Sequence, residues 1–234
     1  MKISHLAIIA ITVLFWSCSK RAPASFEKPV IRQSNADSQP AAYIPINSSP
    51  ATASEVNAAL HRIFADSVHA SCQEHSFTTG DFNGDGSPDL AALVLPNYSK
   101  LKIVNDPLAN WTIQDARQAF VAPADQRVVF LPPKPKPQST HSKELLLAIV
   151  HGYGPNGWRD PNAQQAYLVR HPGTGPIETR RAPQHVEGAP VSLAHSQIIF
   201  EPTRVGFLFW TGSQYAWRAA PHMPVETAES IPPP

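Results

Sequence analysis

Residues 80–90 read Gly-Asp-Phe-Asn-Gly-Asp-Gly-Ser-Pro-Asp-Leu, and this stretch carries the most specific chemistry in the chain. Side chains that bear oxygen or amide groups occupy alternate positions, at Asp81, Asn83, Asp85, Ser87 and Asp89. Ca²⁺ takes six to eight oxygen ligands at about 2.3–2.6 Å, and alternate residues of a tight loop can converge on one point. Gly84 and Gly86 let the backbone curl without a Cβ clash. The sequence therefore predicts a metal-binding loop.

The surroundings of this loop differ from those of an EF-hand. An EF-hand loop needs a bidentate Glu at its twelfth position, which here is Ala92. The preceding residues 76–79 are poor helix formers, and the apolar run 90–95 that follows stops at Pro96. Proline has no N–H, so Pro88 cannot donate a hydrogen bond to a neighbouring strand. We therefore expect a nine-residue loop between two extended segments.

The phrase Asp-Phe-Asn-Gly-Asp-Gly-Ser-Pro-Asp-Leu closely resembles the calcium loop of FG-GAP (VCBS-type) repeats, over residues 80–94. The resemblance implies Ca²⁺ as the cofactor, with side-chain ligands from Asp81, Asn83, Asp85 and Asp89 and the carbonyl of Ser87. Three carboxylates this close repel one another without a cation. A propeller needs about four to eight blades, and the chain contains a single copy of the phrase. We therefore expect the loop without the propeller.

The first 17 residues have the features of a signal peptide. Lys2 supplies a positive charge, and residues 6–16 are apolar apart from Thr12. This run is too short to span a bilayer, which takes about 20 residues. Residues 14–18, Leu-Phe-Trp-Ser-Cys, resemble a bacterial lipobox, which predicts lipidation of Cys18. We therefore expect an exported protein anchored to a bacterial membrane, facing the periplasm or the cell surface. Ordinary cleavage and an uncleaved anchor are the alternatives.

Cys18 and Cys72 are the only cysteines of the chain. Lipidation of Cys18 would leave Cys72 without a partner for a disulfide. We expect Cys72 to be a small buried residue, as free cysteines usually are.

Composition divides the chain into a tether, a folded domain and a tail. Residues 18–51 are rich in Ser, Ala, Pro and Asn, without a periodic apolar pattern, which predicts a disordered tether. Thr52 and Glu55 form a capping box, and apolar residues follow at helical spacing to Val68, which predicts a helix over about 53–70. The folded domain is expected over 52–222, and residues 223–234 are expected to be disordered.

The rest of this domain reads mainly as strands. We expect them at 89–95, 101–104, 127–131, 144–150, 165–169, 197–201, 206–210 and 214–218, with a hairpin connection at 211–213. Residues 114–120 are expected to form a second, shorter helix. The predicted fold class is α+β: a single domain in which an N-terminal amphipathic helix packs on a mainly antiparallel β-sheet, with the calcium loop at the connection between helix and sheet.

A second polar segment, residues 151–160, follows the apolar run 145–150. It contains a formal Gly-x-Gly-x-x-Gly, but Pro161 and the strand-like residues after it leave no room for the helix that a dinucleotide site requires. His151, Arg159 and Asp160 are candidates for a secondary, hydrolytic site. The alternative, which we favour, is that Gly-rich turns reverse the chain while Tyr153 and Trp158 pack over the sheet edge.

These observations favour a non-catalytic function. The net charge of +1 gives no electrostatic basis for binding nucleic acid. No Gly-x-Ser-x-Gly nucleophile elbow is present. We expect a lipid-anchored, calcium-stabilised module that binds an unknown protein or polysaccharide. The alternatives are a small hydrolase that uses the 151–160 loop, with structural calcium, and a divergent adhesion module of the FG-GAP/VCBS type.

Overall fold

The computed structural model describes residues 47–121, 134, 136–182, 196–201 and 206–220. The chain divides into two units, residues 1–42 and 43–234, and all described residues belong to the second. The predicted signal peptide, Cys18, residues 18–46 of the predicted tether, the predicted strand 127–131 and the predicted tail lie outside the described residues. Within the described residues, no helix is long and apolar enough to cross a membrane.

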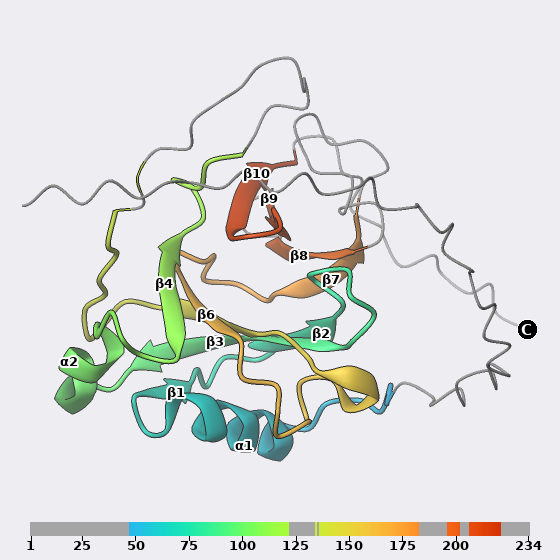
Figure 1. Cartoon of the computed structure of the whole chain (residues 1–234), viewed down its shortest axis with the longest axis horizontal. Coiled ribbons are helices and arrows are strands. Elements are labelled where there is room, and N and C mark those ends of the chain that lie inside the picture. Colours follow the sequence, from blue (N-terminus) through green and yellow to red (C-terminus); the bar gives the residue numbers. More distant parts are fainter. Residues whose placement is uncertain (1–46, 122–133, 135, 183–195, 202–205, 221–234) are drawn as a thin grey trace, which may run out of the picture. The chain divides into compact units, whose positions relative to one another are not determined.

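The strands form two sheets (Figure 1). The larger sheet has the order β1-β3-β5-β6-β4, and β2 also pairs with β3. Its strands are β1 (Val68–Ala70), β2 (Phe77–Gly80), β3 (Asp89–Pro96), β4 (Trp111–Asp115), β5 (Leu146–Val150) and β6 (Ala166–Arg170). The smaller sheet has the order β10-β9-β8-β7, with β7 (Glu178–Arg181), β8 (Gln197–Glu201), β9 (Gly206–Trp210) and β10 (Tyr215–Ala219). All pairs are antiparallel except β4 with β6.

The main helix, α1 (Ala53–Phe64), begins with the predicted capping box. The Thr52 side chain accepts a hydrogen bond from the Glu55 amide, and the Glu55 side chain accepts one from the Thr52 amide. The helix ends at Phe64, followed by Ala65 at φ +50°. The expected extension to residue 70 is wrong, because Val68 belongs to β1 and pairs with Pro96. The other helical segments are η1 (Tyr98–Lys100), α2 (Leu101–Val104) and η2 (Gly154–Asn156).

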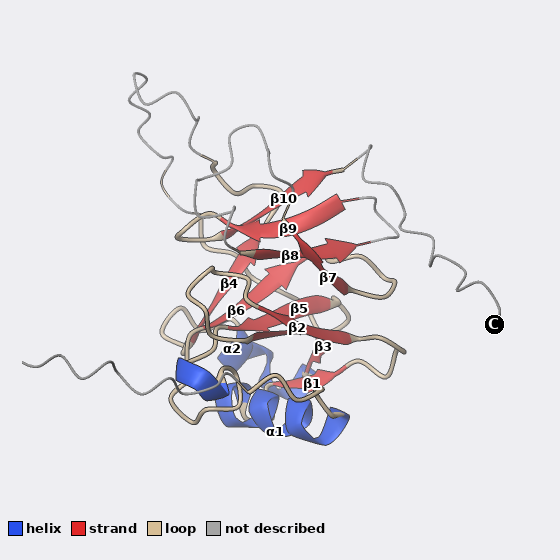
Figure 2. Cartoon of the chain, turned by 90° about the vertical axis from the view of Figure 1, so that its right-hand side faces the viewer, coloured by secondary structure: helices blue, strands red, loops and turns tan. Residues whose placement is uncertain are grey.

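Both faces of the larger sheet are buried. Leu90, Ala92 and Val94 of β3 face α1 and pack with its Val56 and Leu60. The alternate residues of the same strand, Ala91 and Leu93, pack against the smaller sheet. β5 and β6 alternate in the same way, and Figure 2 shows α1 on one side of the larger sheet and the smaller sheet on the other. Burial on both faces explains why β3 and β5 are continuous apolar runs in the sequence.

The two sheets are also joined along their edges. At one edge, the amide of Trp217 in β10 donates to the carbonyl of Ala116, which follows β4, at 2.9 Å. At the other, the Thr179 hydroxyl of β7 donates to the Thr79 carbonyl of β2 at 2.7 Å. The amide of Gln197 donates to the Asp81 carbonyl at 2.6 Å, so the predicted metal loop also contacts the smaller sheet.

The described structure is mostly sheet, with few and short helices, as the sequence indicated, but two sheets take the place of one. The strand expected at 101–104 is wrong, since these residues form α2. The helix expected at 114–120 is also wrong, because Gln114 and Asp115 end β4, which pairs with β6 in parallel. A parallel partner contributed by a distant part of the chain outweighs local helix propensity here.

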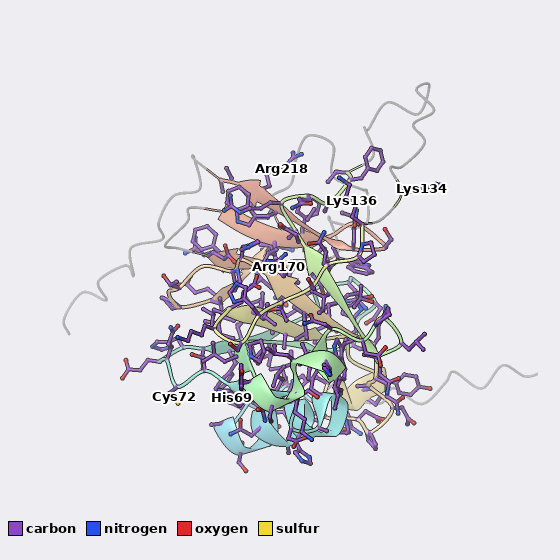
Figure 3. The ribbon with its side chains drawn as sticks, turned by 90° about the vertical axis from the view of Figure 1, so that its left-hand side faces the viewer. His69, Cys72, Lys134, Lys136, Arg170 and Arg218 are labelled. Atoms are coloured by element: carbon purple, nitrogen blue, oxygen red, sulfur yellow. The ribbon has the colours of Figure 1, made fainter. Side chains whose placement is uncertain are left out.

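Cys72 is a further correction. We expected it to be buried, but it is an exposed free cysteine in the segment between β1 and β2, and it lies near the margin of the molecule in Figure 3. The segment carries little apolar surface, since residues 72–75 are all exposed.

Candidate metal loop and the adjoining cleft

The predicted metal loop is the connection of a β-hairpin. β2 and β3 are antiparallel, and their last pair is Gly80 with Asp89, so residues 81–88 form the turn. The loop thus joins two strands of one sheet, and our expectation that it joins the helix to the sheet is wrong. Phe82 anchors it, because its side chain is 1 % exposed and packs between the two sheets.

Asp81 organises the first half of the loop. One oxygen of its carboxylate accepts hydrogen bonds from the amides of Gly84, at 2.7 Å, and Asp85, at 3.1 Å. The other accepts from the amide of Gly86 at 2.9 Å. Partial burial raises the pKa of Asp81, and the nearby Asp85 carboxylate adds to this, while the amides of Gly84 and Gly86 oppose it. The Asp81 carboxylate therefore stabilises the turn by accepting hydrogen bonds from its backbone amides.

The outer half of the loop is more open. The Asn83 side chain donates to one oxygen of Asp85 at 2.7 Å and accepts from the Asp85 amide at 3.0 Å. The other Asp85 oxygen accepts from the Ser87 amide at 2.7 Å. Asp85 is exposed, and Asn83 and Ser87 are half-buried. These side chains are accessible to a cation from solvent.

Asp89 lies at the base of the loop and is fully buried, with 0 % exposure. One oxygen accepts from the amides of Phe82, at 2.7 Å, and Asn83, at 3.3 Å. The other accepts from the amide of Gly152 at 2.6 Å. The pKa of Asp89 is raised to about 8, mainly by burial and also by the carboxylates of Asp85 and Asp81, against the opposing effect of the backbone donors.

The proposed ligands of the loop suit a hard cation such as Ca²⁺, because their coordinating atoms are all oxygens. A carboxylate has about four lone-pair sites. Asp81 and Asp89 each accept three amide hydrogen bonds, which leaves capacity on both. Within the described ranges, however, no three His, Cys, Asp or Glu side chains stand together as a ready metal site. The metal site therefore stays a prediction.

The 151–160 loop packs directly on the metal loop, at Pro88. The Trp158 amide donates to the Pro88 carbonyl at 2.8 Å. A Cβ added at Gly152 would lie 2.2 Å from the same carbonyl oxygen, and one added at Gly157 would lie 2.3 Å from it. Only glycine permits so close an approach of two backbones. The two segments that the sequence singled out separately thus form one unit, joined also by the bond between Asp89 and Gly152.

The structure does not bring His151, Arg159 and Asp160 together as a catalytic group. The His151 ring is buried, and its Nε2 lies 2.7 Å from the Tyr215 hydroxyl. Arg159 binds Glu55 of α1 at 2.9 Å. Asp160 accepts hydrogen bonds from the amide and side chain of Asn162. Each side chain therefore has a different set of partners.

His151 belongs to an aromatic cluster between the sheets. The rings of Tyr167, Trp210 and Tyr215 lie 4.9–5.8 Å from its own, measured between centroids. Burial lowers the pKa of His151 to about 4, so the ring is neutral at pH 7. Trp158 is buried as the favoured interpretation of this loop predicts, but Tyr153 is 58 % exposed and does not pack over the sheet.

A cleft of about 370 Å³ adjoins the metal loop. Asp81, Gly86 and Pro88 of the loop form one part of its wall, and the remaining lining comes from Asn47, Ser48, Ser49, Thr79, Gly80, Trp158, Arg159 and Gln197. Segment 47–50 is held in place by the 151–160 loop: the Asn47 amide donates to the Pro155 carbonyl, and Arg159 donates to the carbonyls of Ser49 and Pro50.

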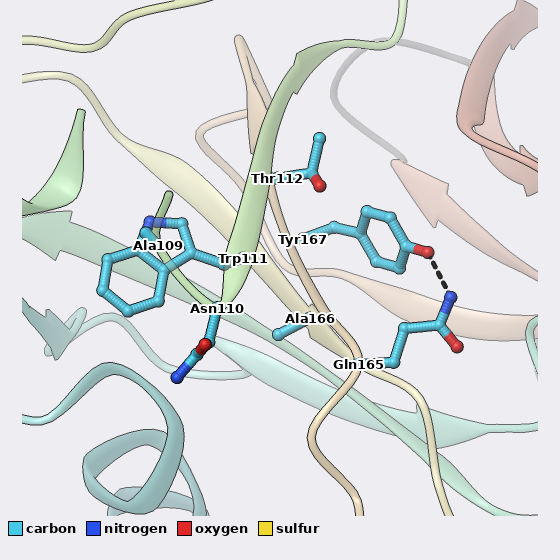
Figure 4. Close-up of a pocket in the computed structure, with 7 residues that line it drawn as sticks. All are labelled: Ala109, Asn110, Trp111, Thr112, Gln165, Ala166 and Tyr167. Carbon is cyan, nitrogen blue, oxygen red and sulfur yellow. Dashed lines mark hydrogen bonds between the residues drawn. The ribbon is translucent and has the colours of Figure 1, made fainter. Parts of the chain in front are cut away.

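A second cavity, of about 320 Å³, lies at the edge formed by β4 and β6 (Figure 4). Trp111 and Tyr167 contribute its aromatic lining, and Figure 4 shows the two rings pointing away from each other. Gln165 donates a hydrogen bond to the Tyr167 hydroxyl. The cavity includes none of the residues that the sequence singled out for chemistry.

Sequence reasoning missed the part that Gln197 plays at this site. Its side-chain oxygen accepts from the Asp81 backbone amide at 2.9 Å, and its backbone amide donates to the Asp81 carbonyl at 2.6 Å. It lies 116 positions from Asp81 along the chain. No local pattern could indicate this contact.

Comparison with family models, with curated proteins and with solved structures gives no match for this chain.

Proposed function

We propose that this protein is an exported, lipid-anchored module whose α+β domain, residues 52–222, is stabilised by Ca²⁺ in the 81–89 loop and acts by binding rather than by catalysis. One observation carries this proposal. Asp89 is a fully buried carboxylate placed beside the carboxylates of Asp81 and Asp85. No ion pair between these three and a cationic side chain occurs within the described residues.

A bound cation would favour the ionised form of this group, since an opposite charge offsets both desolvation and mutual repulsion. The proposed ligands are the side chains of Asp81, Asn83, Asp85 and Asp89 and the carbonyl of Ser87. Ca²⁺ would supply the positive charge that the loop lacks. The FG-GAP/VCBS-type resemblance of residues 80–94 supports the choice of Ca²⁺ but leaves an adhesion role as an alternative.

The rival proposal, a hydrolase built on the 151–160 loop, receives no support from the side-chain contacts. A general base has to reach the proton that it abstracts. His151 is buried against Tyr215, and Arg159 binds Glu55. We therefore retain a non-catalytic role with an unknown protein or polysaccharide as the partner, and Cys18 as the lipidated residue.

The decisive experiment measures calcium binding and stability together. Ca²⁺ that binds the native state alone raises the free energy of unfolding by RT ln(1 + [Ca²⁺]/Kd), about 2.7 kcal/mol at a hundredfold excess over Kd. We expect a higher melting temperature in Ca²⁺ than in EGTA. Equal melting temperatures, together with no bound calcium in equilibrium dialysis, would exclude the metal site. An unmodified Cys18 in the mature protein, detected by mass spectrometry, would exclude the anchor.

A further inference from the structure

The cleft beside the metal loop contains polar groups that have no partner within the described residues. The Gln197 side chain uses its oxygen for the Asp81 amide, and no bond is formed by its Nε2 within the same ranges. The Thr79 hydroxyl is likewise without a partner among the described groups, whereas the Thr79 carbonyl is bound by Thr179. A ligand that accepts hydrogen bonds would satisfy these donors.

The charges around the cleft favour a neutral ligand. The guanidinium of Arg159 is already bound to Glu55 and to the carbonyls of Ser49 and Pro50. The three loop carboxylates together exceed the charge of one Ca²⁺, so the loaded loop keeps a residual negative charge. An anionic ligand would be repelled by that charge. A neutral ligand with several hydroxyl groups would not.

The metal loop itself leaves room for ligand oxygens. If each of its five proposed ligand positions coordinates through one oxygen, the loop supplies fewer than the six to eight oxygens that Ca²⁺ takes. Asp81 and Gly86 place one side of the loop in the wall of the cleft. Hydroxyl groups of a molecule in the cleft are therefore close to the loop and to the unpartnered donors at once.

We propose that this cleft binds a neutral polyhydroxyl ligand, such as a hexose unit of a polysaccharide, and that Ca²⁺ in the loop takes part in holding it. The inference rests on the proposed calcium function and specifies the partner of that module. Thr79 and Gln197 donate hydrogen bonds to the hydroxyl oxygens, and Trp158 forms part of the wall. The 81–89 loop supplies the remaining contacts.

Titration of the ¹⁵N-labelled protein with the methyl glycosides of mannose, galactose and glucose tests this by NMR. In Ca²⁺, we expect shifts at the amides of Gly80, Gly86 and Arg159 and at the indole N–H of Trp158. These shifts should vanish in EGTA. Thr79→Val should lower the affinity for the glycoside that binds by a factor of about 2 to 10, as loss of one hydrogen bond implies. The matched change Thr112→Val, in the other cavity, should leave its affinity unchanged.

The outcomes separate this inference from the function on which it rests. Calcium binding without shifts from any of the three glycosides would overturn the ligand proposal and leave the calcium module intact. Equal shifts in EGTA would overturn the part assigned to Ca²⁺. Binding of sodium acetate in place of the glycosides would overturn the neutral class. Loss of affinity in Thr112→Val alone would move the site to the other cavity. Absence of calcium binding would overturn both proposals.

Discussion

The 81–89 and 151–160 loops meet at Pro88 but are ordered in different ways. The first is held by its own side chains, because the carboxylates of Asp81 and Asp89 accept hydrogen bonds from backbone amides. The second is shaped by the absence of side chains at Gly152 and Gly157, where the Pro88 carbonyl approaches. The 81–89 loop can therefore be predicted from local residue spacing, whereas the shape of the 151–160 loop depends on a distant neighbour, Pro88.

The largest effect should follow from filling the contact at Pro88. In Gly157→Ala, the new Cβ would lie 2.3 Å from the Pro88 carbonyl oxygen, and the backbone at φ +58° adds strain. We expect a loss of more than about 4 kcal/mol of stability, within the range of strained or overpacked sites. Urea unfolding measures it.

Gly154 provides the matched control for this change. It has nearly the same φ, +57°, but a Cβ there meets no atom within 4 Å. Gly154→Ala should cost only the left-handed backbone strain, about 1–2 kcal/mol. Equal losses in the two variants would show that Pro88 does not constrain this loop.

The second effect concerns the two kinds of carboxylate in the metal loop. Asp89→Ala leaves the buried amide of Phe82 and the partly buried amides of Asn83 and Gly152 without their acceptor. Because each unsatisfied buried group costs about 1–3 kcal/mol, we expect a loss of about 3 kcal/mol or more in EGTA. Asp85→Ala, at an exposed position, should cost less than about 1 kcal/mol in EGTA but should abolish the stabilisation by Ca²⁺.

Melting curves of both variants, with and without Ca²⁺, check this difference. If Asp85→Ala retained the calcium-dependent increment in full, Asp85 would not be a ligand. If Asp89→Ala melted like the wild type in EGTA, the hydrogen bonds of Asp89 would not stabilise the fold.

Much of the fold could be predicted where the pattern was local. The capping box at Thr52 fixed the start of α1, and continuous apolar runs marked β3 and β5. Two of the failures occurred where a distant segment decides the structure. Residues 114–115 join β4 because β6 pairs beside them, and Val68 leaves the helix to pair with Pro96.

In the candidate site, too, local features were predictable and contacts with distant segments were not. The spacing of acidic residues identified the 81–89 loop, and its place between extended segments agrees with the β2–β3 hairpin. The contact of Gly152 and Gly157 with Pro88 was not predictable, because glycines in a turn do not reveal which backbone approaches them. The contact of Gln197 with Asp81 left no signal either, since it joins residues 116 positions apart.

A third prediction uses the titration of His151, at the start of the second loop. Burial lowers the pKa of its ring to about 4 in the folded protein, against about 6.5 in an unfolded chain. Between these values the unfolded state binds more protons, so stability rises with pH. The contribution is complete above pH 6.5 and is lost as pH falls towards 4. A difference of this size corresponds to about 3 kcal/mol.

His151→Phe should flatten this part of the pH profile, because the variant has no ring to protonate. Its stability should be lower at neutral pH, since the Tyr215 hydroxyl loses its partner. Urea unfolding between pH 4 and 7 provides the measurement. His61→Gln, at an exposed position of α1, serves as the control and should keep the wild-type profile. A His151→Phe profile as steep as that of the wild type would contradict the assignment.

The smallest effect on stability should come from Arg159, at the far end of the second loop. Its guanidinium joins Glu55 to the carbonyls of Ser49 and Pro50, and the bond from Arg159, with those from Thr52, lowers the pKa of Glu55 to about 2. Solvent reaches the Glu55 side chain, which is 41 % exposed, so the ion pair itself adds little to stability.

Lysine retains the charge but not the planar fork that serves several acceptors at once. Arg159→Lys should therefore leave the melting temperature almost unchanged while loosening residues 47–50 from the cleft. Hydrogen exchange at the Asn47 amide, which donates to the Pro155 carbonyl at 2.7 Å, reports this loosening. We expect faster exchange at that amide alone, with the amides of β3 protected as in the wild type.

Arg180→Lys, which alters the pair with Glu178 on β7, is the control and should leave the Asn47 amide unaffected. Unchanged protection of Asn47 in Arg159→Lys would mean that Pro155, rather than Arg159, holds this wall of the cleft.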